Sequence, residues 1–118
     1  MQVTIYHNPR CSKSRETLAL LQDRGITPVV VHYLETPPDA ATSRQLMEQL
    51  GVSAREMLRA SEAAYKELGL HDEALSDAQL IAAITAHPEL LQRPIVVAGN
   101  KARFGRPPES VLDIIEPA

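Results

Sequence analysis

The stretch QVTIYHNPRCSKSRETLALLQDRGITPVVVHYL, residues 2–34, contains the change of periodicity that decides the fold. Residues 2–7 alternate and are rich in β-branched side chains, which predicts a strand. From residue 12 to residue 24 the apolar positions follow helical spacing and end before a glycine, which predicts a helix. Residues 28–34 form a continuous apolar run, which predicts a strand covered on both faces, as in a parallel sheet. The stretch therefore predicts a βαβ unit.

Helical patterns dominate the middle of the chain, where no convincing strand occurs. Two capping boxes, Ser53 with Glu56 and Ser76 with Gln79, mark helix starts. Glycines at positions 51 and 69 are suitable helix stops. We expect a helical insertion at about residues 40–90, with two apolar stripes formed by Leu46, Met47 and Leu50, and by Leu80, Ile81 and Ile84.

The β pattern returns after this insertion. Residues 94–98 predict a strand, Gly99 and Asn100 a two-residue hairpin turn, and residues 101–105 a second, more polar strand. Residues 107–115 begin with two prolines and predict a final helix. The element order is β-α-β, helices, β-β-α. It predicts one α/β domain over residues 1–118 with a mixed four-stranded sheet.

Length and composition exclude several classes of protein. The chain has 118 residues, of which 44% are hydrophobic, so one domain can bury a core. Its net charge of −3 argues against a nucleic-acid binder, which would usually be basic. No apolar stretch approaches the roughly 18 residues of a membrane span, and no signal-peptide pattern follows Met1. One cysteine makes no internal disulfide, and no zinc-site spacing occurs. We expect a soluble cytoplasmic protein with a free thiol, without metal, membrane or nucleic-acid partner.

Cys11 is the only cysteine, and it lies at the start of the first predicted helix. Unpaired N–H groups and the positive end of a helix dipole favour an anion at this position, and nearby cations lower a thiol pKa further. Arg10, Lys13 and Arg15 supply such charges, although the sequence does not show which of them contacts a substrate. The alternative is that Cys11 is a small buried residue without chemical function.

Ser14 and His7 are candidates to assist Cys11. The Ser14 hydroxyl, three residues on, could donate a hydrogen bond to the sulfur, and Ser14 occupies the place of the second thiol in a Cys-x-x-Cys motif. His7 either holds a proton near the thiolate or only ends the strand. Because the chain has no second cysteine, an oxidised form of Cys11 must be resolved by an external thiol, such as glutathione or a partner redox protein.

Three arginines are candidate anion ligands: Arg59 at the end of a predicted helix, Arg93 before Pro94, and Arg106 before Pro107. Arginine binds oxyanions through paired N–H donors, so together they would suit a tetrahedral oxyanion. Each alone is equally explained as a solvated residue or, for Arg59, as a cation near a helix C-terminus. Arg103 is an alternative to Arg106 for the same role, although the alternation of side chains along a strand can direct it elsewhere.

The segments YHNPRCSKSR, HYLETPP, MLRASE and RPIVVAGNKARFGRPPESVL together resemble the glutaredoxin-coupled arsenate reductase family, the ArsC-like proteins. The similarity covers nearly the whole chain and is greatest with the short branch of the family. It implies a thioredoxin-like fold with a helical insertion, which agrees with the element order above. It also implies a role in arsenic detoxification without a bound cofactor.

The resemblance implies a reaction and a set of site residues. Cys11 would attack arsenate, glutathione as co-substrate would attack the adduct, glutaredoxin would reduce the mixed species, and arsenite would leave. The positions that match the family's pattern are the oxyanion-binding Arg59, Arg93 and Arg106, the histidine His7, the serine Ser14, and Pro94 at the usual cis-proline position.

Two alternatives and one departure accompany this resemblance. The chain has Gly105 where some members carry a further cysteine. A related branch with the same fold contains regulators that bind RNA polymerase, typically with Cys-x-x-Cys or without the full arginine set. The alternatives to an arsenate reductase are therefore a redox or regulatory interaction module of the same fold, and a monothiol glutathione-exchange protein.

Overall fold

The computed structural model describes residues 2–115, and these form two compact units. The first unit joins the N-terminal part of the chain, up to Tyr33, with the C-terminal part from Arg93. The second unit is Leu34–Gln92. Each unit is described below by itself.

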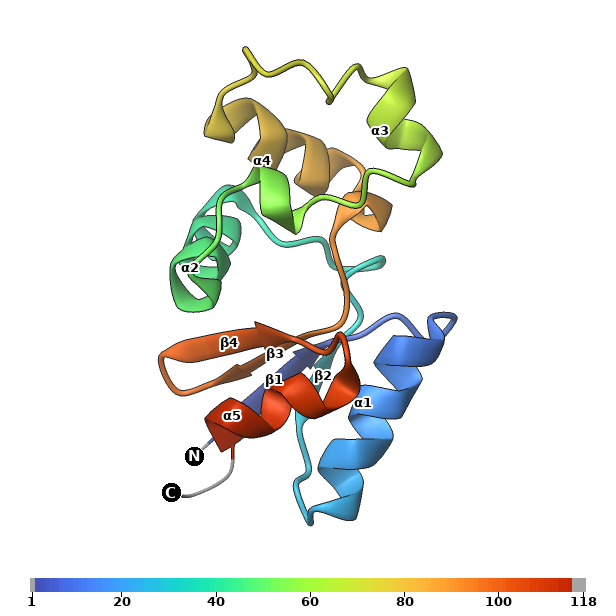
Figure 1. The fold of residues 1–118 in the computed structure, drawn as a ribbon, viewed down its shortest axis with the longest axis vertical. Helices are drawn as coiled ribbons and strands as arrows, with labels where there is room; N and C mark the ends of the chain where they lie inside the picture. Colours follow the sequence, from blue (N-terminus) through green and yellow to red (C-terminus); the bar gives the residue numbers. More distant parts are fainter. Residues whose placement is uncertain (1, 116–118) are drawn as a thin grey trace. The chain divides into compact units, whose positions relative to one another are not determined.

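The first unit is built on a four-stranded mixed sheet with the order β2-β1-β3-β4 (Figure 1). Strand β1 pairs with β2 in parallel and with β3 antiparallel, and β3 pairs antiparallel with β4. The mixed four-stranded sheet predicted from the sequence is therefore confirmed. Its elements in chain order are β1 (Val3–Tyr6), α1 (Ser12–Asp23), β2 (Val29–Val31), β3 (Ile95–Ala98) and β4 (Lys101–Phe104).

One face of this sheet carries α1 and the C-terminal helical segment, and the core of the unit lies between them (Figure 1). The register places Val3 opposite Ala98 and Ile5 opposite Val96, so these four buried side chains lie on the same face. The C-terminal segment is a 3-10 helix, η3 (Pro108–Val111), followed by α5 (Leu112–Ile115), rather than one continuous helix. The helical side chains that complete the core are Leu21, Val111 and Ile114.

The second strand differs from its prediction. The apolar run at residues 28–34 predicts a strand covered on both faces, but β2 spans only Val29–Val31 at the edge of the sheet. Val29 is 46% exposed, and Val30 and Val31 are only partly buried. The prediction of full coverage is wrong because an apolar run does not distinguish a central strand from an edge strand, which depends on pairing far along the chain.

The backbone conformation of the turn between β3 and β4 explains why its two residues have the order Gly-Asn. Gly99 has a φ of 61°, and no residue other than glycine has a positive φ in the described structure. A positive φ at the first central position alone is the pattern of a type II′ turn, which takes glycine there. Gly-Asn is therefore the suitable order, and the more common Asn-Gly order belongs to the type I′ turn.

The second unit is helical. Its helices pack around apolar side chains that are predicted from the sequence, since Leu46, Leu80, Ile81 and Ile84 are all at most 2% exposed. The capping box of Ser76 and Gln79 is confirmed at the start of α4, and Ser53 and Glu56 exchange hydrogen bonds at the first 3-10 turn. The elements are α2 (Ala40–Leu50), η1 (Arg55–Met57), α3 (Ala63–Glu67), α4 (Asp77–Ala86) and η2 (Pro88–Leu90).

Among residues 2–115, no helix combines the length and the apolar character needed to cross a membrane.

Candidate active site

Cys11 is the N-cap residue of α1 and carries the one thiol of the chain. Its backbone is extended, with φ −93° and ψ 123°, and its side chain is partly buried. The turn before it is held by Asn8, whose carbonyl oxygen accepts the Cys11 N–H at 3.0 Å and whose Oδ1 accepts the Arg10 N–H at 3.0 Å. This turn connects β1 directly to the helix and directs the thiol to the N-terminal end of α1.

The surroundings of Cys11 favour its thiolate. Partial burial raises the pKa of the thiol, but the backbone N–H groups of Ser14 and Lys13 and the Arg93 side chain donate hydrogen bonds to the sulfur and lower it. The net effect is a pKa below the ordinary value for cysteine. The physical basis is the one expected from the sequence: unpaired N–H groups at a helix start, reinforced by a positive charge.

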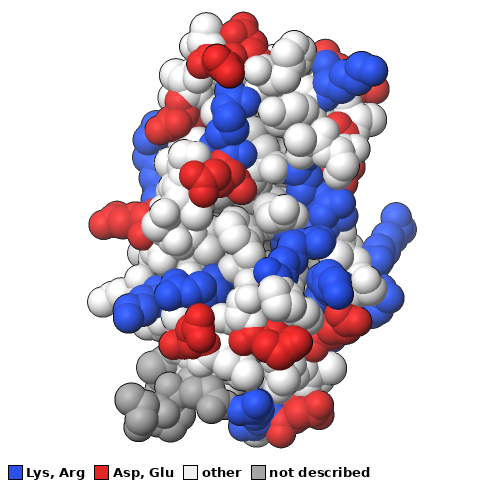
Figure 2. All heavy atoms as spheres, viewed as in Figure 1, with Lys and Arg blue, Asp and Glu red and all other residues white. Residues whose placement is uncertain are grey.

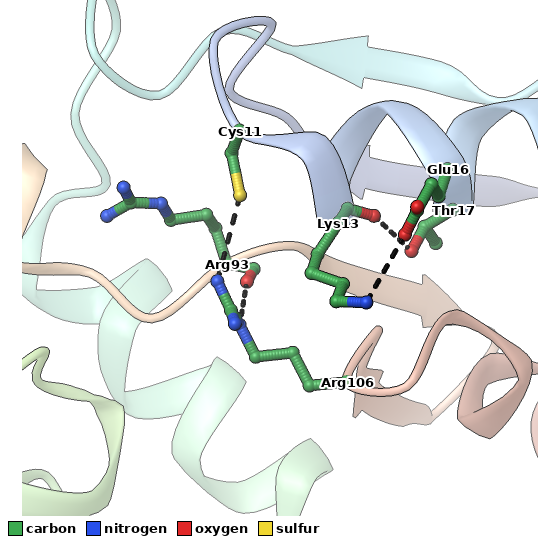
Figure 3. A network of polar contacts seen from close by, with 6 residues as sticks. All are labelled: Cys11, Lys13, Glu16, Thr17, Arg93 and Arg106. Atoms are coloured by element: carbon green, nitrogen blue, oxygen red, sulfur yellow. Dashed lines mark hydrogen bonds and ion pairs between the residues drawn. The ribbon is translucent and has the colours of Figure 1, made fainter.

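Arg106 approaches the same sulfur from the C-terminal part of the first unit (Figure 3). Its Nη2 lies 3.7 Å from Cys11 Sγ, and its Nε donates to the carbonyl oxygen of Arg93 at 2.7 Å. Both arginines precede a cis-proline, since the Arg93–Pro94 and Arg106–Pro107 peptide bonds are cis. The cis bond at Pro94 agrees with the family pattern, whereas the one at Pro107 has no counterpart among our expectations. Cys11, Arg93 and Arg106 therefore meet within one unit, far apart in sequence.

Ser14 contacts the site differently from our expectation. Its hydroxyl oxygen is 2.7 Å from His7 Nδ1 and accepts the Asn8 N–H at 3.0 Å, while Ser14 is completely buried. The bond to the sulfur comes from the Ser14 backbone N–H, not from its hydroxyl. The expected hydroxyl–sulfur bond is thus replaced, because the hydroxyl satisfies two buried groups at the end of β1.

His7 is buried at the end of β1, and its imidazole is held neutral. Burial is the largest cause that lowers the pKa of His7, followed by the charges of His32 and Arg15. Nδ1 of a neutral ring can accept a hydrogen bond from the Ser14 hydroxyl. The hydroxyl oxygen can then accept the hydrogen bond that the Asn8 N–H donates to it. The contacts of His7 are with the Ser14 hydroxyl and, edge to face, with the ring of His32, and its role in the reaction stays a prediction.

The other cations of the motif have separate partners. Lys13 Nζ pairs with Glu16 at 3.5 Å, and Arg15 Nη1 donates to the Pro9 carbonyl oxygen at 2.9 Å. Arg103 donates to the Ala102 carbonyl oxygen at 2.8 Å, and of the pair Arg103 and Arg106 it is Arg106 that reaches the sulfur, beside Arg93. Arg10 is exposed on the turn.

Arg59 belongs to the second unit and follows η1 after an extended residue. Its backbone N–H donates to the Leu90 carbonyl oxygen at 2.7 Å. Its guanidinium lies 3.3 Å from the Glu62 carboxylate and 3.4 Å from Gln92 Oε1. These contacts are all inside the second unit, so a place for Arg59 among the oxyanion ligands stays a prediction.

Gly105 is a residue of the site that sequence reasoning noted only as a missing cysteine. It is buried after β4, and its N–H donates to the Pro94 carbonyl oxygen at 2.9 Å. A Cβ at this position would overlap the Thr17 hydroxyl and come within 2.7 Å of Pro94 Cγ. Any side chain here would press on the segment that carries Arg93. The absence of a Cβ is therefore a packing requirement of this chain.

The alkylation of Cys11 by iodoacetamide should accelerate with pH through a midpoint below that of an ordinary cysteine, because only the thiolate reacts and its pKa is lowered. At pH values between the midpoint of Cys11 and that of an ordinary cysteine, a larger fraction of Cys11 is thiolate, so Cys11 reacts faster than the ordinary cysteine. Arg93→Gln should move the midpoint to higher pH by removing a charge and a donor. Ser14→Ala should move it less, because the backbone N–H remains. Equal movements in the two variants would contradict this assignment.

Comparison with known proteins identifies the family of this chain. The family model described as "ArsC family" matches residues 6–114. The chain is 50% identical over 115 residues to an arsenate reductase of Neisseria meningitidis serogroup A, covering 97% of this chain and 98% of that protein. It is 62% identical over 115 residues to an uncharacterized protein, YfgD, of Escherichia coli K12, covering 97% of each chain.

The solved structures agree. The arsenate reductase from Vibrio cholerae superposes with a TM-score of 0.95 at 56% sequence identity, over 98% of both chains. This likeness confirms the thioredoxin-like α/β fold expected from the sequence. The segment matched by the family model begins at Tyr6, the last residue of β1, and contains the Cys11 turn, both cis-prolines and most of α5. The chain belongs to the ArsC family.

Proposed function

We propose that the protein is an arsenate reductase that uses Cys11 as its nucleophile and an external thiol as its reductant. The observation that carries this proposal is the position of Arg106 Nη2, 3.7 Å from a cysteine sulfur whose pKa is lowered. A thiolate flanked by guanidinium groups suits attack on a tetrahedral oxyanion. The arsenate reductases among the relatives supply the identity of that oxyanion.

The first step joins sulfur to arsenic. The Cys11 thiolate attacks the arsenic atom of arsenate, an S–As bond forms, and one oxygen leaves as water after protonation. Arg93 and Arg106 neutralise the charge on the remaining oxygens, which is the kind of electrostatic stabilisation that dominates many enzymatic reactions. Arg59 is a proposed third ligand. The Ser14 and Lys13 backbone N–H groups keep the thiolate ionised before attack and support it as a leaving group afterwards.

The remaining steps need two further sulfur atoms, because Cys11 is the only cysteine of the chain. Glutathione attacks the arsenic adduct and displaces a second oxygen. A glutaredoxin thiolate then attacks the glutathione sulfur. The bond between that sulfur and arsenic breaks, and its electron pair stays on arsenic. In total, two thiols lose two electrons and become one disulfide, arsenic(V) becomes arsenic(III), and arsenate loses one oxygen as water. Water then attacks the arsenic(III) held on Cys11, which returns one oxygen to arsenic, breaks the S–As bond, releases arsenite and regenerates the Cys11 thiol. A thiol that works in this way belongs in a reducing compartment, so we place the protein in the cytoplasm.

The test is arsenite formation from arsenate by the purified protein, with glutathione and glutaredoxin supplied together or singly. We expect arsenite only when both thiols are present, since glutathione is needed to attack the arsenic adduct and glutaredoxin is needed to attack the glutathione sulfur. A control reaction without the protein measures direct reduction by the thiols. If no arsenite forms while glutathione is still exchanged between mixed disulfides, the monothiol-exchange alternative is correct. If neither reaction occurs, the interaction-module alternative is correct.

A further inference from the structure

A groove of about 490 Å³ runs along the first unit between α1 and the start of the C-terminal helical segment. Lys13, Glu16 and Asp23 line one wall from successive turns of α1, with Leu20 between them. Pro107, Pro108 and Glu109 line the other wall. The groove takes no part in the reaction described above.

One end of the groove is formed by neighbours of the reactive cysteine. Lys13 is its first residue on α1, and the Lys13 backbone N–H donates to Cys11 Sγ. Pro107 on the opposite wall is bonded directly to Arg106, whose Nη2 reaches the same sulfur. Figure 3 shows Cys11, Lys13, Glu16 and Arg106 together at this end. Cys11 does not itself line the groove, but the end formed by Lys13 and Pro107 is the end nearer to it.

The residues that line the groove carry more negative than positive charge. Glu16, Asp23 and Glu109 contribute three carboxylates and Lys13 one ammonium group, which is already paired with Glu16 at 3.5 Å. All three carboxylate residues are exposed. Figure 2 shows acidic side chains along the face of the first unit that carries α1 and α5. An occupant with positive charge at a distance from its thiol would complement this wall.

The length of the groove decides what kind of thiol it fits. From Lys13 to Asp23 the α1 wall is about 15 Å long at 1.5 Å per helical residue, which matches roughly four residues of extended chain. Glutathione has its thiol on the middle residue of a tripeptide and carries two carboxylates and one ammonium group. It is therefore both too short to fill the groove from Cys11 and wrongly charged for it.

We propose that this groove docks a thiol-bearing partner protein through an extended basic segment beside the partner's reactive cysteine. The proposal rests on the proposed function, since it concerns the reductant of the same site. The partner thiolate would attack the sulfur of a disulfide or arsenic–glutathione adduct held at Cys11. The partner sulfur forms the new S–S bond, and the displaced group leaves with the bonding electron pair. The acidic wall holds the basic segment during this exchange.

The experiment uses Cys11 converted to its mixed disulfide with thionitrobenzoate, in the full chain. Two peptides serve as probes: one cysteine followed by a glycine and three lysines, and the same peptide with three glutamates. Attack on the Cys11 sulfur forms a peptide–Cys11 disulfide and releases the coloured thionitrobenzoate anion. The thionitrobenzoate disulfide of N-acetylcysteine amide serves as the reference substrate. The rate of each peptide with the protein is divided by its rate with this reference, which corrects for differences in reactivity between the two peptide thiols.

We expect the lysine peptide to react about tenfold faster than the glutamate peptide after this correction, and the advantage to fall with added salt. The triple variant Glu16→Gln, Asp23→Asn, Glu109→Gln should reduce the advantage to about twofold or less. The control variant Glu48→Gln, Glu67→Gln, Glu73→Gln changes three exposed acidic residues of the second unit. Like the groove variant, it changes the net charge of the chain from −3 to 0. It should keep the advantage.

Three results would overturn the proposal. An advantage that survives the groove variant would place the attraction elsewhere, and an equal loss in the control variant would make it an effect of net charge. A faster glutamate peptide would mean that the site receives an anionic thiol such as glutathione. Because no arsenate is present, a protein that fails as an arsenate reductase would still give a clear result here.

Discussion

Replacing Cys11 by serine should abolish arsenite formation, with a loss of at least about three orders of magnitude relative to wild type. The hydrogen bonds from Ser14, Lys13 and Arg93 lower the pKa of the Cys11 thiol and so stabilise its thiolate. A serine hydroxyl remains protonated in the same surroundings, so the nucleophile is lost. The measurement is the initial rate of arsenite production with glutathione and glutaredoxin present.

The serine variant also provides its own control for folding and binding. Cys11 is an N-cap residue, and serine is a preferred residue at that position, so the variant should be at least as stable as wild type. Arg93 and Arg106 remain in place, so arsenate should still raise its melting temperature by binding to the folded form. Arsenite formation at a rate comparable with wild type would contradict the role of Cys11. Loss of both activity and arsenate binding would show that the thiolate itself is needed to organise the arginines.

Replacing Gly105 by alanine should lower the free energy of unfolding by about 1–3 kcal/mol, the usual cost of overpacking a buried position. The added Cβ would overlap the Thr17 hydroxyl and lie 2.7 Å from Pro94 Cγ. Relief requires movement of α1 or of the Arg93–Pro94 segment, and both carry groups that bond the Cys11 sulfur. We therefore expect slower Cys11 alkylation near neutral pH together with the loss of stability. Urea denaturation and the alkylation rate measure the two effects.

A second substitution separates packing from other causes. Thr17→Ala removes the side-chain atoms of Thr17 that lie nearest to the added Cβ, at the cost of the hydrogen bond from Oγ1 to the Lys13 carbonyl oxygen at 2.7 Å. If overpacking is the cause, Gly105→Ala should destabilise the Thr17→Ala background less than the wild-type background. Strictly additive losses would show that the two positions are independent and that Pro94 alone limits the space.

Local patterns predict much of this protein because their causes are local. The helix at Cys11 follows from apolar spacing and from the turn before it, and the capping box at Ser76 follows from two side chains three residues apart. The stripe of Leu80, Ile81 and Ile84 is buried because one side of a short helix is apolar throughout. The mixed sheet also follows, since a βαβ unit and a hairpin can be recognised separately.

Contacts between distant segments are what the patterns leave open. The apolar run at β2 does not show that its strand lies at the sheet edge with Val29 46% exposed. The Ser14 hydroxyl is nearer in sequence to Cys11 than to His7, yet it bonds the histidine, because the ring of His7 lies beside it in the fold. Gly105 has no local signal at all, because its requirement comes from Thr17 and Pro94.

The sequence by itself thus predicted a thioredoxin-like chain with one thiol at a helix start and no second cysteine to resolve it. Only the tertiary structure decided which cations face that thiol. Arg106 lies 95 residues from Cys11 along the chain and reaches its sulfur at 3.7 Å, while Lys13, two residues away, directs its ammonium group to Glu16. The reason is geometric, since side chains two positions apart on a helix point in different directions, whereas the ends of paired strands bring distant residues together.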